Sequence, residues 1–291
     1  MLTETYQLAN GVTIPKIGYG TWMIADDQAA QRVVEALEIG YRHIDTAQAY
    51  ENEVGVGQGI KESGLPREEI FVTTKLRAEI KDYEEAKAAI DGSLERLGLD
   101  YIDLMIIHSP KPWDDFQNMD NHYYEGNLAA WKALEEAYDA GKLRAIGVSN
   151  FEVNDLENLL NNGRIKPMVN QILAHIGHTP TEVIAFSQAH DILVEAYSPI
   201  AHGEIMRNQM LTDLAAKYQV SVPQLAIRYC LDLGLLPLPK TENPDHMKAN
   251  ADVNFTIEAA DLAKLKVLKE VDYGTNSEIP VFKRAVNEAG K

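Results

Sequence analysis

The sequence alternates between short apolar runs and longer segments with helical periodicity, and this alternation repeats eight times. The expected strands lie near residues 17 and 44 and over 70–75, 104–108, 145–148, 168–171, 193–197 and 235–239. The expected helices follow them over 28–39, 52–63, 83–97, 127–140, 153–160, 181–190, 222–233 and 244–251. Such alternation favours a parallel sheet with right-handed crossovers, and eight units favour a closed barrel. We therefore predict an α/β fold, a (β/α)8 TIM barrel.

Additional segments are expected outside these eight units. Asn10-Gly11 stands between alternating apolar residues, which is the strongest short signal for a β-hairpin. Two extra helical patterns cover 210–218 and 259–271. Because no change in composition marks a linker, we predict that residues 1–291 form a single domain with an N-terminal β-hairpin and two extra helices.

Composition narrows the class of protein. A chain of 291 residues with 45% hydrophobic content can bury the core of a barrel, which typically needs roughly 250 residues. The net charge of −17 argues against nucleic acid and anionic membrane surfaces as partners. The single Cys230 cannot form an internal disulfide, and no apolar stretch suits a signal peptide or a membrane span. We expect a cytoplasmic monomer that acts on a small molecule.

Four polar residues, Asp45, Tyr50, Lys75 and His108, each stand at or just past the end of an expected strand. The carboxyl ends of the strands in a parallel barrel open onto one face, so these separated residues can meet there. Taken singly they are weak evidence, because a lysine or aspartate at a strand end is more often part of a structural ion pair. Their positions at successive strand ends make a common catalytic site the better interpretation.

These residue types fit the reduction of a carbonyl group. Tyr50 would donate the proton, and a nearby Lys75 ammonium would lower its pKa toward useful proton transfer. Asp45 would hold Lys75, and His108 would orient the carbonyl oxygen. No side chain supplies hydride, so a nicotinamide cofactor must.

Several stretches of the sequence resemble the aldo-keto reductase family. They are Gly-Tyr-Arg-His-Ile-Asp-Thr-Ala at 40–47 with Tyr50, Leu-Gly-Leu-Asp-Tyr-Ile-Asp-Leu at 97–104, Gly-Lys-Leu-Arg-Ala-Ile-Gly-Val-Ser-Asn-Phe at 141–151, and Leu-Pro-Lys-Thr at 238–241. The chain is most similar to the small bacterial reductases of the diketogluconate reductase type. The resemblance implies a TIM barrel that uses NADPH without a metal and carries Asp45, Tyr50, Lys75 and His108 as its catalytic tetrad. It also implies an NAD(P)H-dependent oxidoreductase of the CH-OH class that reduces aldehydes or ketones, such as small carbonyls, diketones or keto-sugars, to alcohols.

The resemblance assigns the remaining site residues. Those expected to bind the cofactor are Gly20, Thr21, Trp22, Asp45, Ser149, Asn150, Gln171, Tyr197, Ser198, Ile200, Lys240, Thr241, His246 and Asn250. Those expected to contact substrate are Trp22, Tyr50, His108, Ser109 and Trp113. Within the cofactor set, Tyr197 would stack on the nicotinamide ring, and Ser149, Asn150 and Gln171 would bind its carboxamide.

Two departures from the family pattern bear on specificity. His246 occupies the position where relatives commonly carry an arginine for the 2′-phosphate, so NADPH preference is expected to be softer and NADH to be accepted. Ser109 replaces a tryptophan of the substrate pocket, and Trp113 or Phe116 of the long 109–126 loop would take its place.

Other interpretations remain open at this point. Lys75 could act as the Schiff-base lysine of an aldolase, although a paired Asp45 would raise its pKa and oppose this. The chain could also be a cofactor-binding redox sensor or regulatory subunit without significant turnover. The glycines of the 55–59 segment fit close packing of that helix on the barrel better than a dinucleotide fingerprint, because they lie inside a helical pattern. His175, His178 and His190 lack the spacing of a zinc site, so no metal is expected.

Overall fold

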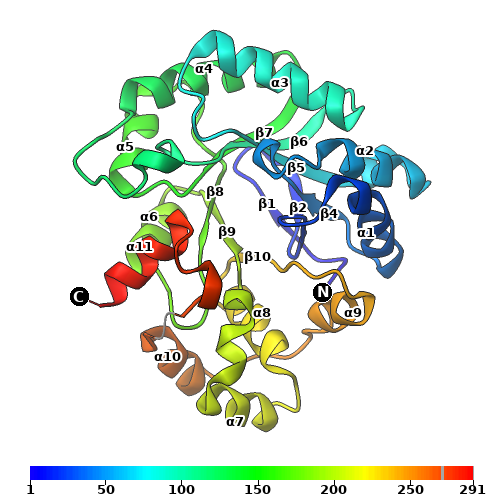
Figure 1. The fold of residues 1–291 in the computed structure, drawn as a ribbon, viewed down its shortest axis with the longest axis vertical. Helices are drawn as coiled ribbons and strands as arrows, with labels where there is room; N and C mark the ends of the chain where they lie inside the picture. The colour runs from blue at the N-terminus through cyan, green and yellow to red at the C-terminus, as the bar shows by residue number, and fades with distance from the viewer. Residues whose placement is uncertain (270–271, 291) are drawn as a thin grey trace.

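A closed parallel sheet forms the centre of the molecule (Figure 1). The computed structural model describes residues 1–269 and 272–290. In this part of the chain the strands of the sheet are β3 Tyr19–Gly20, β4 His43–Asp45, β5 Phe71–Leu76, β6 Ile102–Ile107, β7 Leu143–Ser149, β8 Val169–Leu173, β9 Leu193–Tyr197 and β10 Leu236–Leu238. Each pairs in parallel with the next along the chain. The ring closes where Gly18 N and Gly20 N donate to Pro237 O and Pro239 O, both at 3.1 Å. The predicted barrel class is confirmed.

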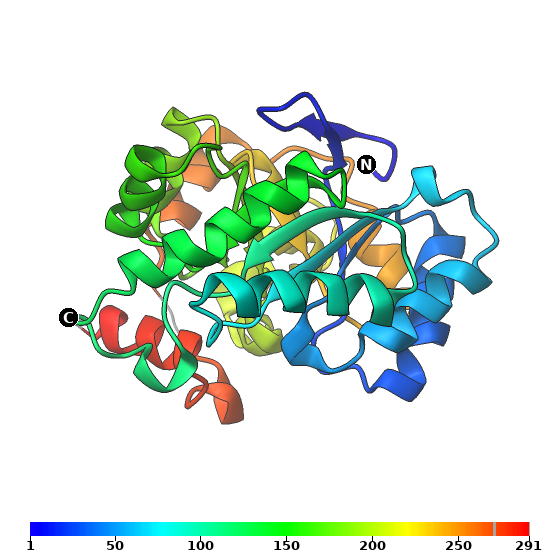
Figure 2. The same cartoon turned by 90° about the horizontal axis from the view of Figure 1, so that it is seen from above.

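Helices surround this sheet on the outside (Figures 1 and 2). Those that follow successive strands are α1 Asp26–Ile39, α2 Glu53–Glu62, α3 Tyr83–Leu97, α4 Tyr124–Asp139, α5 Val153–Asn162, α6 Thr181–Ala189, α8 Val222–Asp232 and α9 Pro244–Ala251. Their ends carry local sequence signals. Asp82 caps α3 by accepting bonds from two backbone N–H groups, and Ser221 with Gln224 forms a capping box at α8. Gly98 ends α3 in the left-handed conformation that favours glycine.

The expected N-terminal hairpin is present as β1 Thr5–Gln7 and β2 Thr13–Pro15, with Gly11 at φ +87° in its turn. Tyr6 Oη donates to Leu235 O at the start of β10, so the hairpin lies at the amino ends of the barrel strands. Figure 2 shows the hairpin and the C-terminal helix toward opposite sides of the barrel.

The helices outside the eight units are α7 Gln209–Lys217, α10 Ala259–Val267 and α11 Pro280–Ala289. The first two were predicted, although residues 270 and 271 of the expected 259–271 segment lie outside the described residues. The sequence analysis missed α11. Its apolar residues Val281, Phe282, Ala285 and Val286 recur at helical spacing, so a signal existed.

Short helical turns in the loops were also not predicted. Three of them, η1 Gln48–Tyr50, η3 Trp113–Asp115 and η4 Ala201–Arg207, follow the carboxyl ends of strands, while η2 Arg67–Glu69 precedes β5 and η5 Gly274–Asn276 precedes α11. The first strand of the barrel was expected near Ile17 and instead spans Tyr19–Gly20. Ile17 is buried in the core, but backbone pairing with β4 begins only at Tyr19.

The glycines of α2 allow close contact with two neighbouring helices. A Cβ on Gly55 would lie 2.1 Å from Asp26 O of α1, and one on Gly57 would lie 2.1 Å from Leu97 O of α3. No L side chain fits at such distances. The close packing expected of this segment is therefore confirmed, but the glycines contact α1 and α3 and not the barrel strands.

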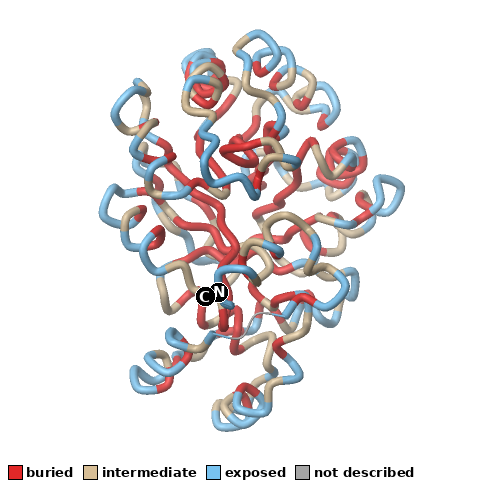
Figure 3. Tube along the Cα trace, turned by 60° about the vertical axis from the view of Figure 1, so that its left-hand side comes forward, coloured by how far each residue is buried: buried red, intermediate tan, exposed pale blue. Residues whose placement is uncertain are grey.

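Buried residues concentrate on the sheet and on the inward faces of the helices, while exposed residues lie on the outer turns (Figure 3). Most of this core is apolar, but several polar side chains are completely enclosed inside the barrel. They are His43, Lys75 and Glu195, each 0% exposed, with Asp45 and Gln171 nearly so. In the described ranges, none of the helices has the length and apolar character that crossing a membrane requires.

We predict that Gly57→Ala lowers the free energy of unfolding by about 1 to 3 kcal/mol, because the added methyl group overpacks the contact between α2 and α3. Gly92→Ala is the matched control, since its Cβ would meet only the flexible end of Arg96 and alanine is the better helix former. Urea unfolding of both variants measures the difference. Equal stability of the two variants would contradict the packing account.

Candidate active site

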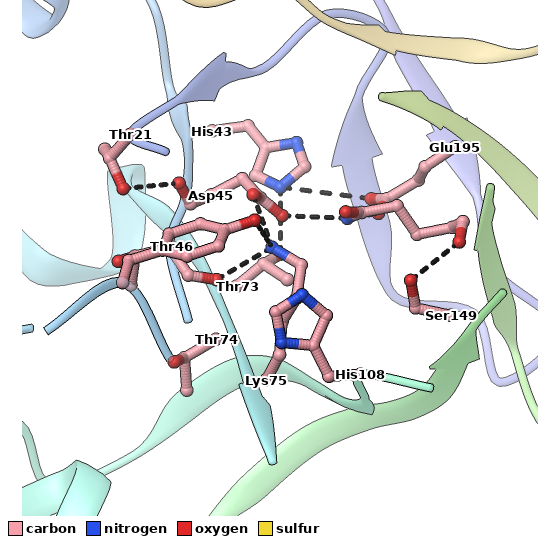
Figure 4. A network of polar contacts seen from close by, with 12 residues as sticks. Thr21, His43, Asp45, Thr46, Thr73, Thr74, Lys75, His108, Ser149 and Glu195 are labelled. Atoms are coloured by element: carbon pink, nitrogen blue, oxygen red, sulfur yellow. Dashed lines mark hydrogen bonds and ion pairs between the residues drawn. The ribbon is translucent and has the colours of Figure 1, made fainter. Parts of the chain in front are cut away.

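The structure brings Asp45, Tyr50, Lys75 and His108 together at the carboxyl ends of β4, β5 and β6. Lys75 Nζ donates to Asp45 Oδ2 at 2.6 Å, to Thr46 O at 2.9 Å and to Tyr50 Oη at 3.2 Å. Figure 4 shows Lys75 between Asp45 and His108. All three ammonium protons are therefore used, and Tyr50 keeps its own hydroxyl proton for another acceptor.

Local structure fixes each of these side chains. Asp45 ends β4, and Thr21 Oγ1 donates to its backbone oxygen at 2.9 Å. The chain then turns through η1, which presents Tyr50 over the strand end. Asn52 braces this turn by accepting from Thr46 Oγ1 at 2.6 Å. The tyrosine thus stands on a braced turn and not on a free loop.

Charge and burial set the protonation states of the ion pair. Burial acts to lower the pKa of Lys75, but the Asp45 carboxylate and Tyr50 outweigh it and raise that pKa above its ordinary value. Burial raises the pKa of Tyr50, and Lys75 opposes this rise. Lys75 thus acts on the pKa of Tyr50 in the expected direction, but burial has the larger effect, so the net shift is upward. Tyr50 is a protonated phenol at neutral pH.

His108 faces Tyr50 on one side and Trp113 on the other. The ring centroids lie 5.7 Å from Tyr50 and 5.2 Å from Trp113, both edge to face. Burial lowers the pKa of His108 well below its ordinary value, and the cations Lys75 and Arg77 add to this effect. The imidazole is therefore neutral at physiological pH, so it can donate a hydrogen bond without carrying charge.

An amide cluster adjoins the tetrad at the ends of β7 and β8. Gln171 Nε2 donates to Asp45 Oδ1 at 2.8 Å and to Glu195 Oε2 at 2.7 Å. Asn150 Nδ2 donates to His108 O at 3.0 Å, and Ser149 Oγ donates to Gln171 O at 2.8 Å. The cluster is therefore bonded directly to two members of the tetrad.

Tyr197 lies at the end of β9 and donates its hydroxyl to Asn150 Oδ1 at 2.7 Å. Burial raises the pKa of Tyr197 well above its ordinary value, so the phenol remains a donor. A cleft opens here between the strand ends and α11, and its lining includes Asn150, Tyr197, Phe116 and Arg284.

The segment after β9 folds back over the first loop of the barrel. Ser198, Ala201 and His202 have positive φ values of 50°, 45° and 56°. The His202 ring packs edge to face on Trp22 and on Phe282 of α11, at centroid distances of 5.4 and 4.8 Å. Trp22 is thereby held against η4 and α11. Among the described residues, Trp22 makes no hydrogen bond to Asp45, Tyr50, Lys75 or His108.

The expected adenosine-side residues lie after β10. Lys240 Nζ is bonded to Glu242 Oε1 at 2.7 Å, so its charge is partly balanced. Thr241 O accepts from Tyr19 Oη at 2.7 Å, and Asn250 is buried in α9. His246 is exposed in the first turns of the same helix. The structure places these residues on adjoining segments.

Ser109 plays a structural part in the loop that follows β6. It is completely buried, its hydroxyl donates to Lys111 O at 2.7 Å, and its carbonyl accepts from Lys81 Nζ at 2.8 Å. Trp113 instead lies beside His108 and packs on Phe116 at a centroid distance of 5.5 Å. Of the two expected substrate residues in this loop, Trp113 is the one next to the tetrad.

The sequence analysis missed three residues near the site. Glu195 is the one acid in the otherwise apolar β9, His43 precedes Asp45 by two positions on β4, and Arg284 belongs to the unpredicted α11. A charged residue within an apolar strand is the signal that could have identified Glu195. His175 is structural, because its ring nitrogens bond to Ile176 O and Tyr273 Oη.

The fold is a TIM barrel with Asp45, Tyr50, Lys75 and His108 gathered at its strand ends, and comparisons with known proteins identify an oxidoreductase family. Residues 16–270 match the model of the Aldo/keto reductase family. Glyoxal reductase of Bacillus subtilis is 41% identical over 284 residues, which cover 97% of this chain and 99% of that protein. Methylglyoxal reductase DkgA of Escherichia coli is 36% identical over 267 residues, covering 91% and 93%. The crystal structure of a Bombyx mori aldo-keto reductase in complex with NADP has a TM-score of 0.84 at 35% identity, covering 97% and 99%. The chain therefore belongs to the aldo/keto reductase family.

We predict that Lys75→Met lowers the free energy of unfolding by about 3 to 5 kcal/mol, because it leaves the buried Asp45 carboxylate without its cation. Adding Asp45→Asn is expected to restore part of this loss, since the double variant has no uncompensated charge. A double-mutant cycle by urea unfolding at neutral pH gives the coupling. If the double variant loses as much unfolding free energy as the two single variants together, Lys75 and Asp45 do not form the ion pair described here.

Proposed function

We propose that this protein reduces aldehydes or ketones to alcohols with NADPH, and that Tyr50 donates the proton. The observation that carries the proposal is the bonding of Lys75, which is completely buried and donates to both Asp45 and Tyr50. A phenol that accepts from an ammonium can release its proton to a carbonyl oxygen as charge develops there. The same ammonium then stabilises the tyrosinate that remains.

The donor set fits a nicotinamide cofactor. Gln171 donates both amide protons to carboxyl oxygens of Asp45 and Glu195, so its amide oxygen is left to accept from a carboxamide N–H. Ser149, Asn150 and Gln171 would bind the carboxamide, and the Tyr197 ring, fixed by its bond to Asn150, would support the flat ring. The bound cofactor supplies the hydride.

The other proposed cofactor contacts follow the barrel rim. Gly20, Thr21, Trp22 and Asp45 would border the nicotinamide, Ser198 and Ile200 the pyrophosphate, Thr241 and Asn250 the adenosine, and Lys240 with His246 the 2′-phosphate. All of them come from one barrel, which supports a single-domain chain that acts as a monomer.

The substrate would lie between Tyr50 and His108, with its carbonyl oxygen near both. His108 is neutral, so it would orient the oxygen by donating a hydrogen bond, while Trp113 and Trp22 would wall the pocket. Ser109 would contribute by fixing the loop that carries Trp113. Because the relatives include a glyoxal reductase and a methylglyoxal reductase, we propose small 2-oxoaldehydes as the first substrates to test.

Two rival functions are less well supported. A Schiff-base aldolase needs a neutral lysine, whereas Asp45 and Tyr50 raise the pKa of Lys75. A cofactor-binding sensor has no need of a complete proton-donor cluster. Borohydride trapping with substrate tests the first rival, and NADPH binding without oxidation across a carbonyl panel would favour the second.

We predict that Tyr50→Phe slows glyoxal reduction by about 10² to 10⁴, because general acid catalysis is removed, while NADPH affinity stays close to that of the wild type. NADPH absorbance under single-turnover conditions measures the rate, and quenching of intrinsic fluorescence measures binding. Tyr83→Phe on α3 is the control, since its hydroxyl bonds to Glu136 outside the barrel. A rate above one third of the wild type for Tyr50→Phe would exclude it as the acid.

We predict that both cofactors are accepted and that NADPH is favoured. A histidine at position 246 is a weaker partner than a guanidinium for the 2′-phosphate, which NADH lacks. His246→Arg is expected to strengthen NADPH binding by roughly 1 to 2 kcal/mol and to leave NADH binding unchanged. The control is His190→Arg at the end of α6. The same NADPH affinity for wild type and His246→Arg would remove His246 from the site.

A further inference from the structure

Glu195 is a carboxyl group inside the barrel that the proposed reaction does not use. Its side chain is 0% exposed and comes from the middle of β9. Its Oε2 accepts from Gln171 Nε2 at 2.7 Å, whereas its Oε1 has no hydrogen-bond partner among the residues that the structure describes. Figure 4 shows Glu195 on the opposite side of the barrel interior from Asp45. A carboxylate with a bare oxygen in such a place is costly, and a carboxylic acid is much less so.

The Gln171 amide joins Glu195 to the tetrad. Its nitrogen has two protons and donates one to Asp45 Oδ1 and the other to Glu195 Oε2, at 2.8 and 2.7 Å. The opposite orientation of the amide would bring its oxygen against two carboxyl oxygens. Glu195 and Asp45 together therefore decide which end of the Gln171 amide faces the proposed carboxamide site.

The groups that face Glu195 contain too little positive charge for two carboxylates. His43 and Asp45 face it from β4, Lys75 from β5 and Gln171 from β8, while β10 contributes only leucine and proline side chains. Burial, with Lys75, lowers the pKa of His43 to about 3, so this ring is neutral. Lys75 is the one cation in the set, and it is bound to Asp45.

The protonation of Glu195 follows from this arrangement. Burial, together with the Asp45 charge, raises the pKa of Glu195 to about 8, although Gln171 and Lys75 act in the opposite direction. At neutral pH the barrel interior then holds one ion pair, Asp45 with Lys75, and one uncharged carboxyl.

We propose that Glu195 is a positioning residue of the active site: its uncharged carboxyl fixes the Gln171 amide toward Asp45, and loss of its proton at alkaline pH weakens Tyr50 as a proton donor. The second half rests on the proposed function of Tyr50. A new negative charge across Gln171 from Asp45 disfavours the tyrosinate that forms as the proton leaves, and it offsets part of the Lys75 charge. Carbonyl reduction therefore falls as pH rises through about 8.

Thermal unfolding tests the protonation without any catalysis. In the unfolded chain the carboxyl ionises near pH 4.5, but in the fold it keeps its proton to about pH 8. Between these two pH values unfolding releases a proton from Glu195, so the free energy of unfolding falls as pH rises. Above about pH 8 the carboxyl is ionised in both states, and the destabilisation stays constant. Glu195→Gln cannot ionise. Its Tm relative to the wild type is expected to rise from pH 5 to pH 8 and then level off.

Glu135→Gln is the control for this measurement. Its carboxylate is also buried, but it accepts from the backbone N–H groups of Arg164 and Ile165, both at 2.7 Å, away from the tetrad. Its Tm difference from the wild type is not expected to rise in this way. A Tm difference for Glu195→Gln that stays constant from pH 5 to pH 8 would overturn the proposal, whether or not the protein reduces carbonyls.

Catalysis and cofactor binding test the positioning role. In Glu195→Gln, the pH at which kcat/KM for glyoxal falls on the alkaline side is expected to be at least one unit higher than in the wild type. A fall at the same pH in both proteins would overturn this role. Glu195→Leu removes the acceptor for Gln171 as well as the charge, so NADPH affinity is expected to fall about tenfold, as for one lost hydrogen bond, while Glu195→Gln retains it. Equal NADPH affinity in the leucine and glutamine variants would show that Glu195 does not hold Gln171. The leucine variant also reports the pH effect if the glutamine variant does not fold.

Discussion

The buried ion pair between Asp45 and Lys75 is the interaction on which the site depends. Lys75 Nζ and Asp45 Oδ2 lie 2.6 Å apart, and neither side chain has appreciable contact with solvent. A lone charge in this interior would be strongly disfavoured, so each partner keeps the other ionised. The pair therefore places a permanent ammonium against the Tyr50 hydroxyl, which a solvent-exposed lysine could not do with the same strength.

The parallel barrel makes this pair possible, because adjacent strands deliver their side chains at the same level. Asp45 on β4 aligns with Thr73 on β5, two positions before Lys75, and Gln171 on β8 aligns with Glu195 on β9. The strand ends thus form a polar layer over an apolar core. The same register links the tetrad to the amide cluster, so the proposed proton donor and the proposed carboxamide site are parts of one hydrogen-bonded network.

Much of this arrangement could be predicted from the sequence. The alternation of strands and helices indicates the barrel, and the strand-end positions of Asp45, Tyr50, Lys75 and His108 predict that these side chains meet. Other features could not be predicted, because they depend on three-dimensional packing. The burial that raises the pKa of Tyr50 and the contacts of His202 with Trp22 and α11 involve segments that no local sequence pattern relates. Glu195 carries a visible signal as an acid in an apolar strand, but its bond to Gln171 depends on the pairing of β8 with β9.

The dependence of Tyr50 on the buried ion pair is tested most directly by the single-turnover rate of glyoxal reduction by Lys75→Met with NADPH at neutral pH, in protein shown to be folded. We expect a fall of about a hundredfold or more, since Tyr50 would lose the ammonium that stabilises its anion. NADPH affinity is expected to change little in the same variant. A rate within threefold of the wild type would mean that proton transfer does not depend on the buried ion pair.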